Sequence, residues 1–437
     1  MEKGLSKNIV SNIIDNGANG SGIAKVDGAV CFVPLTIQGE KVSFDVVSHE
    51  KNYCLCKLGS VIEKSENRTL PFCIYFGMCG GCQLQHMKNQ FQLDFKTKQV
   101  KTILEKTLKV DVPILPCKRE NEYAYRNKVN FAICNNKLCF AKADGSFFEV
   151  ESCPLFKTDL SEIIKVVNKY LSSAKPNVVA FHIRNLNGKY QFTFVSKEDE
   201  LEHKELIISL LNELSISFSL FLSTNKIANS SNITENVKCL FGNDKLDYEI
   251  LGIKSKISPG SFLQVNEKVQ NEIYTQINSQ IPSESKVINA YGGTGILSSI
   301  MAKCASFVYS VEINKAASAN CSEMLKENNI TNVRAICGDC KVEIPKILKT
   351  ENISHIVFDP PRSGINPSIL NTVAALKIPN LIYLSCNPST LARDLKLLCS
   401  SYEIKFVQPF DMFPQTSHVE TLVFLKIRSW NWVLFVV

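Results

Sequence analysis

After Pro259 the sequence alternates regularly between short apolar runs and stretches long enough for a helix, and this pattern constrains the fold more than any other feature. The apolar runs cover residues 286–291, 307–311, 333–336, 355–358 and 381–385. Such alternation is typical of a doubly wound sheet of parallel strands with helices on both faces. Ligands of these sheets bind at the carboxyl ends of the strands. We therefore predict an α/β fold with a Rossmann-like doubly wound domain over residues 256–437.

The part of the chain before this domain is long enough for further domains, since 437 residues exceed one ordinary core. Alternating apolar runs between glycine-rich turns, such as residues 29–34 and 41–47, predict a small β-barrel over residues 1–62. Strand-like runs together with a helical segment predict a mixed α+β domain over residues 63–255. Apolar residues at helical spacing predict a surface helix over residues 89–110.

Composition gives weaker indications. An excess of 49 Lys and Arg over 42 Asp and Glu leaves a charge of +7, a mild bias toward polyanionic partners. Residues 1–10 lack the apolar core of a signal peptide, and the apolar run at residues 430–437 is far shorter than the roughly 20 residues of a membrane span. Seventeen cysteines without an export signal favour reduced thiols. We therefore expect a cytoplasmic protein without membrane contact.

A glycine-rich turn follows the first strand of the predicted sheet. Residues 287–291 run into Gly-Gly-Thr-Gly at 292–295, where a ligand can approach the backbone at a helix start. Glu312 closes the next strand, where a carboxylate can accept both hydroxyls of a ribose. Ser298 stands where a dinucleotide enzyme usually has Gly or Ala, which favours S-adenosylmethionine over NAD. The alternatives are a tight turn without a ligand, a solvated Glu312, and an NAD-linked oxidoreductase.

Three further residues lie at the ends of apolar strands. Asp359 begins Asp-Pro-Pro-Arg, Cys386 lies in Ser-Cys-Asn-Pro, and Glu420 lies in His-Val-Glu-Thr. Taken singly, each has an ordinary structural explanation, namely a turn aspartate, a packing cysteine and a solvated edge charge. Methylation of a uridine at C5 requires a nucleophile that adds to C6, a base that removes the C5 proton, and a group that orients the uracil. The three residues match these three requirements.

A cysteine motif lies near residue 80. Cys73 is followed by Cys79-Gly-Gly-Cys82, and Cys153 is a candidate fourth thiolate. Closely spaced cysteines separated by glycines can wrap an iron–sulfur cluster. A structural zinc site also uses four thiolates, and the identity of the ligands alone does not separate the two metals.

These motifs together resemble the RNA 5-methyluridine methyltransferase family, in particular the branch with an N-terminal TRAM domain and a four-iron, four-sulfur cluster that modifies large-subunit (23S) ribosomal RNA. The resemblance covers nearly the full length. It rests on the glycine-rich segment 20–39 with Gly-Glu-Lys-Val, on residues 73–86, on Tyr-Arg-Asn-Lys-Val at 125–129, on Pro-Gly-Ser-Phe-Leu-Gln-Val-Asn at 259–266, and on the Asp359, Cys386 and Glu420 motifs.

The resemblance implies a role for each candidate residue. Cys386 would be the nucleophile and Glu420 the base, while Asp359 would also face the flipped uracil. Contacts to the cofactor S-adenosyl-L-methionine would come from Gln264, Tyr291, Glu312 and Asp359. A [4Fe-4S] cluster would be held by Cys73, Cys79, Cys82 and Cys153. The glycine motif departs from the family pattern, because Asn289 and Gly292 replace its usual Asp and Cys, and residues 428–437 match nothing in the family.

The resemblance also implies that RNA, most of all ribosomal RNA, is the partner of a monomeric protein. The OB-like TRAM barrel would grip RNA through backbone charge and base stacking, with Phe32 and Lys41 as candidate contacts, although a core aromatic and a solvated lysine explain them equally well. The target base would leave its stack to reach Cys386. Two alternatives are a tRNA uridine C5-methyltransferase and a catalytically inactive RNA-binding assembly factor of the ribosome.

Overall fold

The computed structural model describes residues 7–227 and 230–428. Residues 430–437, the unmatched apolar end of the sequence, lie outside this described part. Contacts divide the chain into two units. The first unit consists of Met1–Lys96, Asn121–Asn243 and Phe413–His418, and the second consists of Thr97–Glu120, Asp244–Met412 and Val419–Val437. The helix α1 (Asn89–Leu108), predicted from its apolar spacing, contains one of the boundaries.

The first unit begins with a six-stranded sheet in the order β1-β5-β6-β4-β3-β2. Its buried residues are small or branched apolar side chains together with Phe44. Residues of this kind are favoured in strands, and the alternating apolar runs of the sequence had predicted strands here. Its strands are β1 (Ile9–Asn12), β2 (Asp15–Asn16), β3 (Gly22–Val26), β4 (Ala29–Val33), β5 (Lys41–His49) and β6 (Cys54–Glu63).

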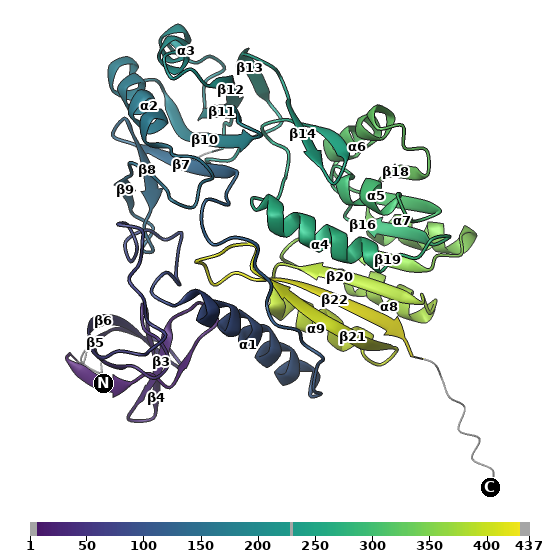
Figure 1. Cartoon of the computed structure of the whole chain (residues 1–437), viewed down its shortest axis with the longest axis horizontal. Coiled ribbons are helices and arrows are strands. Elements are labelled where there is room, and N and C mark those ends of the chain that lie inside the picture. The colour runs from purple at the N-terminus through teal and green to yellow at the C-terminus, as the bar shows by residue number, and fades with distance from the viewer. Residues whose placement is uncertain (1–6, 228–229, 429–437) are drawn as a thin grey trace. The chain divides into compact units, whose positions relative to one another are not determined.

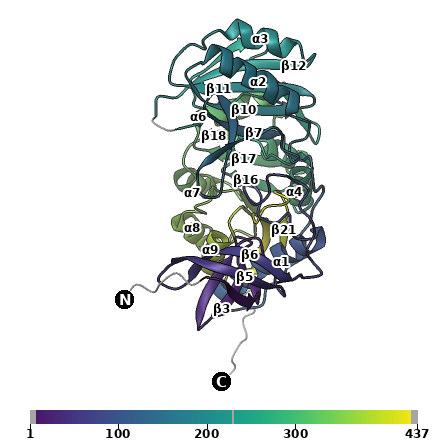
Figure 2. The same ribbon diagram turned by 90° about the vertical axis from the view of Figure 1, so that its left-hand side faces the viewer.

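A second sheet of the first unit has seven strands in the order β13-β12-β11-β10-β7-β8-β9. The helices α2 and α3 pack against one face of it and share an aromatic-rich core with its strands (Figure 2). The elements are β7 (Lys128–Cys134), β8 (Lys137–Ala141), β9 (Phe147–Glu149), α2 (Ser161–Ala174), β10 (Val178–Leu186), β11 (Lys189–Ser196), α3 (Lys204–Asn212), β12 (Ser217–Thr224) and β13 (Val237–Phe241). The predicted strands and helix of this region are therefore present.

The second unit contains a seven-stranded sheet in the order β18-β17-β16-β19-β20-β22-β21 (Figure 1). Strands β16 to β20 are parallel, and β22 runs antiparallel to both of its neighbours. A hairpin, β14 (Leu246–Ile250) and β15 (Ile253–Ile257), precedes this sheet. The strands are β16 (Lys286–Ala290), β17 (Phe307–Glu312), β18 (Val333–Cys337), β19 (His355–Phe358), β20 (Asn380–Ser385), β21 (Tyr402–Phe410) and β22 (Glu420–Ile427).

The helices of the second unit alternate with its strands, which confirms the predicted doubly wound fold. They are α4 (Glu267–Ser279), α5 (Ile296–Met301), α6 (Lys315–Glu327), α7 (Cys340–Thr350), α8 (Pro367–Ala375) and α9 (Pro388–Leu398). Five of them begin at an Asn or Asp whose side chain accepts a hydrogen bond from the first turn, which fixes where each helix starts after its strand. Among the described residues, no helix has the length and apolar character needed to cross a membrane.

The order of the strands also locates a ligand crevice. From β16 the chain continues to β17 and β18 on one side, and later to β19 and β20 on the other. The carboxyl ends of β16 and β19 therefore lie at the point where the winding reverses, which is where open α/β sheets bind ligands. Tyr291 and Asp359 are the first residues after these two strands.

Candidate active site at the carboxyl edge of the sheet

Cys386 lies between the end of a strand and the cap residue of a helix. β20 ends at Ser385, and Asn387 caps α9 by accepting a hydrogen bond from the Ser389 backbone N–H (3.0 Å). Pro388 fits the first position of the helix because it needs no backbone hydrogen bond there. The cap and the proline thus fix the chain on either side of a half-buried thiol at the rim of the sheet.

Glu420 reaches the same rim from a strand of opposite direction. β22 pairs with β20 antiparallel, with Ser385 opposite Thr421. If this register is continued by one step, Cys386 falls opposite Glu420, and the Glu420 charge indeed raises the pKa of Cys386. The carboxyl group is only 4% exposed, so Glu420 is not the solvated edge charge that its place at the start of a strand suggests. The pairing of these two strands brings a thiol and a carboxyl group together from positions far apart in the sequence.

Asp359 completes this group of side chains. It follows β19, its backbone N–H donates to the Ala290 carbonyl (3.4 Å), and two prolines after it prevent the sheet from continuing. Its charge acts on both partners, because it raises the pKa of Glu420 and that of Cys386. The three residues that sequence analysis selected at separate strand ends therefore lie within electrostatic range of one another.

The environment of these three side chains favours their protonated, uncharged forms. Burial raises the pKa of Glu420 to about 8, and the negative charge of Asp359 adds to this effect. Burial likewise raises the pKa of Asp359 to about 7. The pKa of the Cys386 thiol is raised by burial first and then by the Glu420 charge. A carboxyl group with a pKa of about 8 is poised to exchange a proton near neutral pH.

Arg362 is a residue of this site to which sequence analysis gave no role. Its guanidinium lowers the pKa of both Cys386 and Glu420, against the direction of burial. The signal was present in the sequence, since Arg362 ends the Asp-Pro-Pro-Arg motif, but a strand-end arginine is usually a surface charge. Its position close to both groups makes Arg362 the cation that favours their ionised forms.

The glycine turn after β16 is built around Glu312. One carboxylate oxygen of Glu312 accepts a hydrogen bond from the Gly293 N–H (2.9 Å), and the other accepts from the Asn314 N–H (2.7 Å). Tyr291 adopts a φ of 63°, a left-handed conformation that is uncommon for a tyrosine and marks a constrained backbone. Tyr291 and Glu312 are thus held at the ends of adjacent strands, as expected for ligand contacts.

The two departures from the family's glycine motif belong to one local arrangement. A side chain at Gly292 would collide with the Ser310 hydroxyl, so glycine suits this position. Ser310 accepts a hydrogen bond from Ser298 (2.8 Å), which itself accepts one from the Asn289 amide (2.8 Å). Asn289, Ser298 and Gly292 therefore form one local arrangement around Ser310 of β17.

Gln264 lies in the segment that leads into α4, two residues before the cap Asn266, and is half-buried. α4 itself lies beside Asp359, because burial and the Asp359 charge raise the pKa of Tyr274, a tyrosine of this helix that also accepts a hydrogen bond from Gln270 (3.1 Å). Gln264 is thus attached to a helix that borders the site. Sequence analysis did not single out Gln270 and Tyr274.

The second candidate site, in the first unit, contains the four cysteines. All four are half-buried. The charge of Cys73 raises the pKa of Cys79 and of Cys153, and the charges of Cys79 and Cys153 raise the pKa of Cys82. The charges of the four thiols that sequence analysis grouped are therefore linked to one another, and the grouping as metal ligands stays a prediction.

Several groups near these thiols stabilise negative charge on sulfur. Burial is the largest influence and raises the pKa of Cys79, Cys82 and Cys153, whereas the Arg126 charge lowers the pKa of all three. The Gly81 N–H donates to the Cys79 sulfur (3.4 Å). Within residues 7–227 and 230–428, no set of three or more His, Cys, Asp or Glu side chains is arranged to hold a metal ion.

The two candidate RNA contacts in the first sheet have structural partners. Phe32 packs edge-on against Tyr53, with ring centroids 5.4 Å apart. Lys41 forms an exposed ion pair with Glu63 (3.3 Å). Both observations agree with the structural explanation given above, and neither tests binding of RNA.

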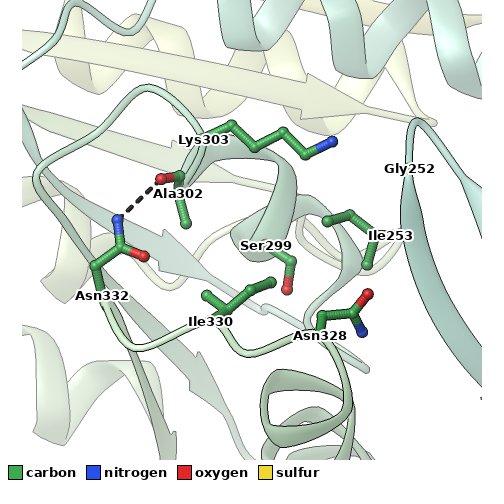
Figure 3. A pocket seen from close by; sticks show the side chains of 8 residues that line it. All are labelled: Gly252, Ile253, Ser299, Ala302, Lys303, Asn328, Ile330 and Asn332. Carbon is green, nitrogen blue, oxygen red and sulfur yellow. Dashed lines mark hydrogen bonds between the residues drawn. The ribbon is translucent and has the colours of Figure 1, made fainter.

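A small pocket in the second unit, of about 170 Å³, lies away from the candidate active site (Figure 3). Asn332, which lines it, comes directly before β18, and Ala302, which also lines it, comes directly after α5, so the pocket lies toward the amino ends of the strands. Its amides are already engaged, since Asn332 donates to the Ala302 carbonyl (2.9 Å) and Asn328 donates to the Lys254 carbonyl (2.7 Å). We assign no ligand to it.

Known proteins resemble this chain over most of its length. The model of the tRNA (uracil-5-)-methyltransferase family matches residues 88–428. An RNA methyltransferase of Clostridium acetobutylicum is 32% identical over 95% of this chain and 96% of its own length. One of Listeria innocua is 32% identical over 97% of this chain and 99% of its own.

A solved structure shares the fold. The Pyrococcus abyssi tRNA (uracil-54, C5)-methyltransferase in complex with S-adenosyl-L-homocysteine superposes with a TM-score of 0.78, covers 95% of this chain and 100% of its own, and is 21% identical. At this identity the likeness establishes the α/β methyltransferase fold and nothing more specific. Together, the family match over most of the chain and relatives similar along their whole length show that the chain belongs to the tRNA (uracil-5-)-methyltransferase family of RNA methyltransferases.

Proposed function

We propose that this protein methylates C5 of a uridine in RNA with S-adenosylmethionine as methyl donor, that Cys386 is the nucleophile, and that Glu420 is the base. The observation that supports the proposal is the pairing of β20 with β22, which ends next to Cys386 and Glu420, together with the effect of the buried Glu420 carboxyl group, whose pKa is about 8, on the pKa of Cys386. The nucleophile and the base must both reach one uracil ring, and this register provides that arrangement.

The proposed reaction begins at sulfur. The Cys386 thiolate adds to C6 of the uracil, which moves electron density to C5 and makes this carbon nucleophilic. C5 then attacks the sulfonium methyl group that S-adenosylmethionine supplies, the bond between this methyl group and the donor sulfur breaks, and S-adenosylhomocysteine leaves. Glu420 accepts the proton that C5 still carries, the C5–C6 double bond forms again, and the bond between Cys386 and C6 breaks. The proton ends on Glu420 and the thiolate is regenerated.

The residues at the carboxyl edge fit the methyl donor. Glu312 uses one lone pair of each oxygen for a backbone N–H, and the remaining lone pairs can accept hydrogen bonds from the two ribose hydroxyls. Tyr291 and Asp359 flank the crevice between β16 and β19, and Gln264 precedes the bordering helix α4. We propose these four residues as cofactor contacts, with Asp359 also orienting the uracil.

Large-subunit ribosomal RNA is the substrate we propose, because the cysteine motif and the glycine-rich amino-terminal sequence resemble the branch that acts on it, and we propose that the amino-terminal sheet is the TRAM domain. The test is incubation of the purified protein with labelled S-adenosylmethionine and either unmodified 23S ribosomal RNA or unmodified tRNA. Label in C5-methyluridine of ribosomal RNA alone supports the proposal. Label in tRNA alone would identify a tRNA enzyme instead, and no label in either RNA would favour an inactive assembly factor.

The pH dependence of the last step follows from Glu420. A base accepts a proton only when it is ionised, and a pKa of about 8 leaves most of this carboxyl group protonated at pH 7. We expect the adduct between Cys386 and methylated RNA to break down about tenfold faster per pH unit up to roughly pH 8, and at a constant rate above it. Single-turnover release of free methylated RNA measures this rate.

Arg362→Gln should move this profile to higher pH. Removal of the guanidinium takes away the charge that lowers the pKa of both Cys386 and Glu420. Methylation at pH 7 should fall and should recover in part at high pH, because smaller fractions of Cys386 and Glu420 are then ionised at pH 7. Lys396→Gln, which removes an exposed positive charge from α9, serves as control and should leave the profile in place. An unchanged profile for Arg362→Gln would contradict this role.

We also propose that Cys73, Cys79, Cys82 and Cys153 hold a [4Fe-4S] cluster. The linked charges of the four thiols, the Arg126 charge and backbone N–H groups directed at sulfur support the fit, because thiolate ligands need compensation of their negative charge. When bound, the cluster would supply a cross-link between the cysteine segment and Cys153. The methylation steps above require no redox change, so we propose a structural role.

Anaerobic purification should yield a brown protein that contains iron and acid-labile sulfide. Cys82→Ser should lose the iron and lower the thermal midpoint of unfolding, because a cross-link between distant segments of the chain is removed. Cys239→Ser, which changes an exposed cysteine of the same unit, should retain both iron and stability. Stoichiometric zinc without sulfide would assign the site to zinc instead.

A further inference from the structure

A second pocket, of about 190 Å³, lies in the first unit and has no role in the reaction described above. Its framework is a short pairing of two segments: Arg68 bridges to Met87, the Thr69 N–H donates to the His86 carbonyl (2.9 Å), and the Lys88 N–H donates to the Asn67 carbonyl (2.8 Å). The pocket is smaller than the roughly 300–1,000 Å³ typical of sites for drug-sized ligands. Its size suits a single planar ring.

An aromatic pair forms one side of this pocket. Phe72 and Tyr123 pack edge to face, with ring centroids 4.6 Å apart and an angle of 84° between the planes. They nevertheless remain 39% and 45% exposed, and the neighbouring Leu70 is 90% exposed. Exposed aromatic and aliphatic side chains that gather at one pocket usually mark a contact surface. Their open ring faces are available for stacking.

Polar groups with fixed positions line the rest of the pocket. The side-chain oxygen of Gln415 accepts a hydrogen bond from the Gln92 amide (2.9 Å), and that of Gln85 accepts from the Cys73 N–H (3.2 Å). Both glutamines are buried and held in place; the Gln85 side chain is also hydrogen-bonded to the Cys82 thiol and so belongs to the framework of the pocket, which leaves Gln415 as the amide proposed to face a base. Lys88 adds an exposed positive charge. Aromatic faces, an oriented amide and a lysine are the groups that bind, respectively, the ring, the edge and the phosphate of an unpaired nucleotide.

The pocket is connected along the chain to both candidate sites. Gln415 precedes the proposed base Glu420 by five residues, so the chain itself limits how far a nucleotide at Gln415 can lie from the reacting uridine. Gln85 binds the backbone of Cys73, the first of the four cysteines. A nucleotide in this pocket would therefore contact the segment that the proposed cluster stabilises.

We propose that this pocket binds one unpaired base of the substrate RNA, a neighbour of the target uridine, by stacking on Phe72, which Tyr123 supports edge to face, and so helps to hold the RNA while the target base is extruded. This inference rests on the proposed action on RNA and adds to it a second nucleotide-binding site outside the catalytic crevice. It also gives the cysteine segment a purpose, namely to support a surface that recognises RNA.

The test compares Phe72→Ala and Tyr123→Ala with the unchanged protein in equilibrium binding to the RNA that the protein methylates. Each substitution should weaken RNA binding by about 5- to 100-fold, the usual effect of losing one base–aromatic stack. The affinity for S-adenosylmethionine should stay the same, because the pocket residues belong to the first unit and the glycine turn belongs to the second. Phe147→Ala removes a 49% exposed aromatic side chain from β9 of the same unit and should bind RNA normally.

A cycle with abasic RNA identifies the bound base. Removing the base at one unpaired position near the target uridine should weaken binding to the unchanged protein by a similar factor and should weaken binding to Phe72→Ala no further, since both changes break the same contact. Unchanged RNA affinity in both alanine variants, or an equal loss in Phe147→Ala, would overturn the proposal. Failure of the proposed function would look different, because the unchanged protein would then methylate neither ribosomal RNA nor tRNA.

Discussion

Cys386→Ala abolishes methyl transfer if the sulfur forms the bond to C6, and the expected loss in rate is roughly 10⁴-fold or more. Without the thiolate, C5 of the uracil remains too weak a nucleophile to attack a methyl sulfonium, and no other group at the rim can replace sulfur. The variant should still bind RNA and S-adenosylmethionine, because Cys386 sits between elements whose caps and strand pairing do not depend on its side chain. Transfer of labelled methyl groups to RNA measures the loss.

The matched control for this variant is Cys337→Ala. Cys337 is an exposed cysteine at the carboxyl end of β18, on the same edge of the same sheet but several strands away from β20. It should retain methylation at a normal rate. A normal rate in Cys386→Ala would show that the nucleophile has been assigned wrongly, whereas loss in both variants would point to a general disturbance of the sheet.

The fold of the second unit could be predicted from the sequence because its strands are buried on both faces. The run that ends at Ser385 was predicted to begin at Leu381, and β20 begins one residue earlier. Asp359, Glu312 and Tyr291 could be placed at the ligand edge by the same logic, since parallel strands all present their carboxyl ends on one side. The local sequence pattern was therefore sufficient to place a residue when its location depended only on its position along a strand.

The partnership of Cys386 with Glu420 could not be predicted in this way. It depends on the insertion of the last strand, β22, between β20 and β21, and on a register that no local pattern encodes. The burial of Glu420 depends on the same insertion, and so does its raised pKa. The family resemblance provided this pairing, and the strand register provides its physical basis.

Arg362 and Tyr274 were not singled out for a similar reason. An arginine after two prolines and a tyrosine on an amphipathic helix have ordinary surface and core explanations, and only the tertiary structure sets them beside charged groups of the site. Asn289 is the opposite case. It differed from the family pattern, but its hydrogen bond to Ser298 shows that the departure is part of a consistent local arrangement.

Glu420→Gln should trap the reaction after methyl transfer. Glutamine keeps the size and hydrogen-bonding capacity of the side chain but cannot accept the C5 proton, so the bond between Cys386 and C6 cannot break. The protein should accumulate a covalent adduct with methylated RNA that survives denaturing electrophoresis, while multiple turnover falls by about 10³-fold or more. Mass spectrometry of the Cys386 peptide after nuclease digestion should find the added methylated nucleotide.

The fold should tolerate this substitution, which makes the result interpretable. With a pKa of about 8, Glu420 is mostly uncharged at pH 7, so a neutral amide replaces a group that is already neutral in the folded protein. Because the folded form binds the proton more tightly than an unfolded chain does, the natural protein should lose stability as the pH rises from about 4 toward 8, and Glu420→Gln should lose less. Glu403→Gln, at an exposed position of β21, should form no adduct. A combined Cys386→Ala and Glu420→Gln variant that still formed the adduct would place the covalent bond on another residue and remove the basis of the proposed mechanism.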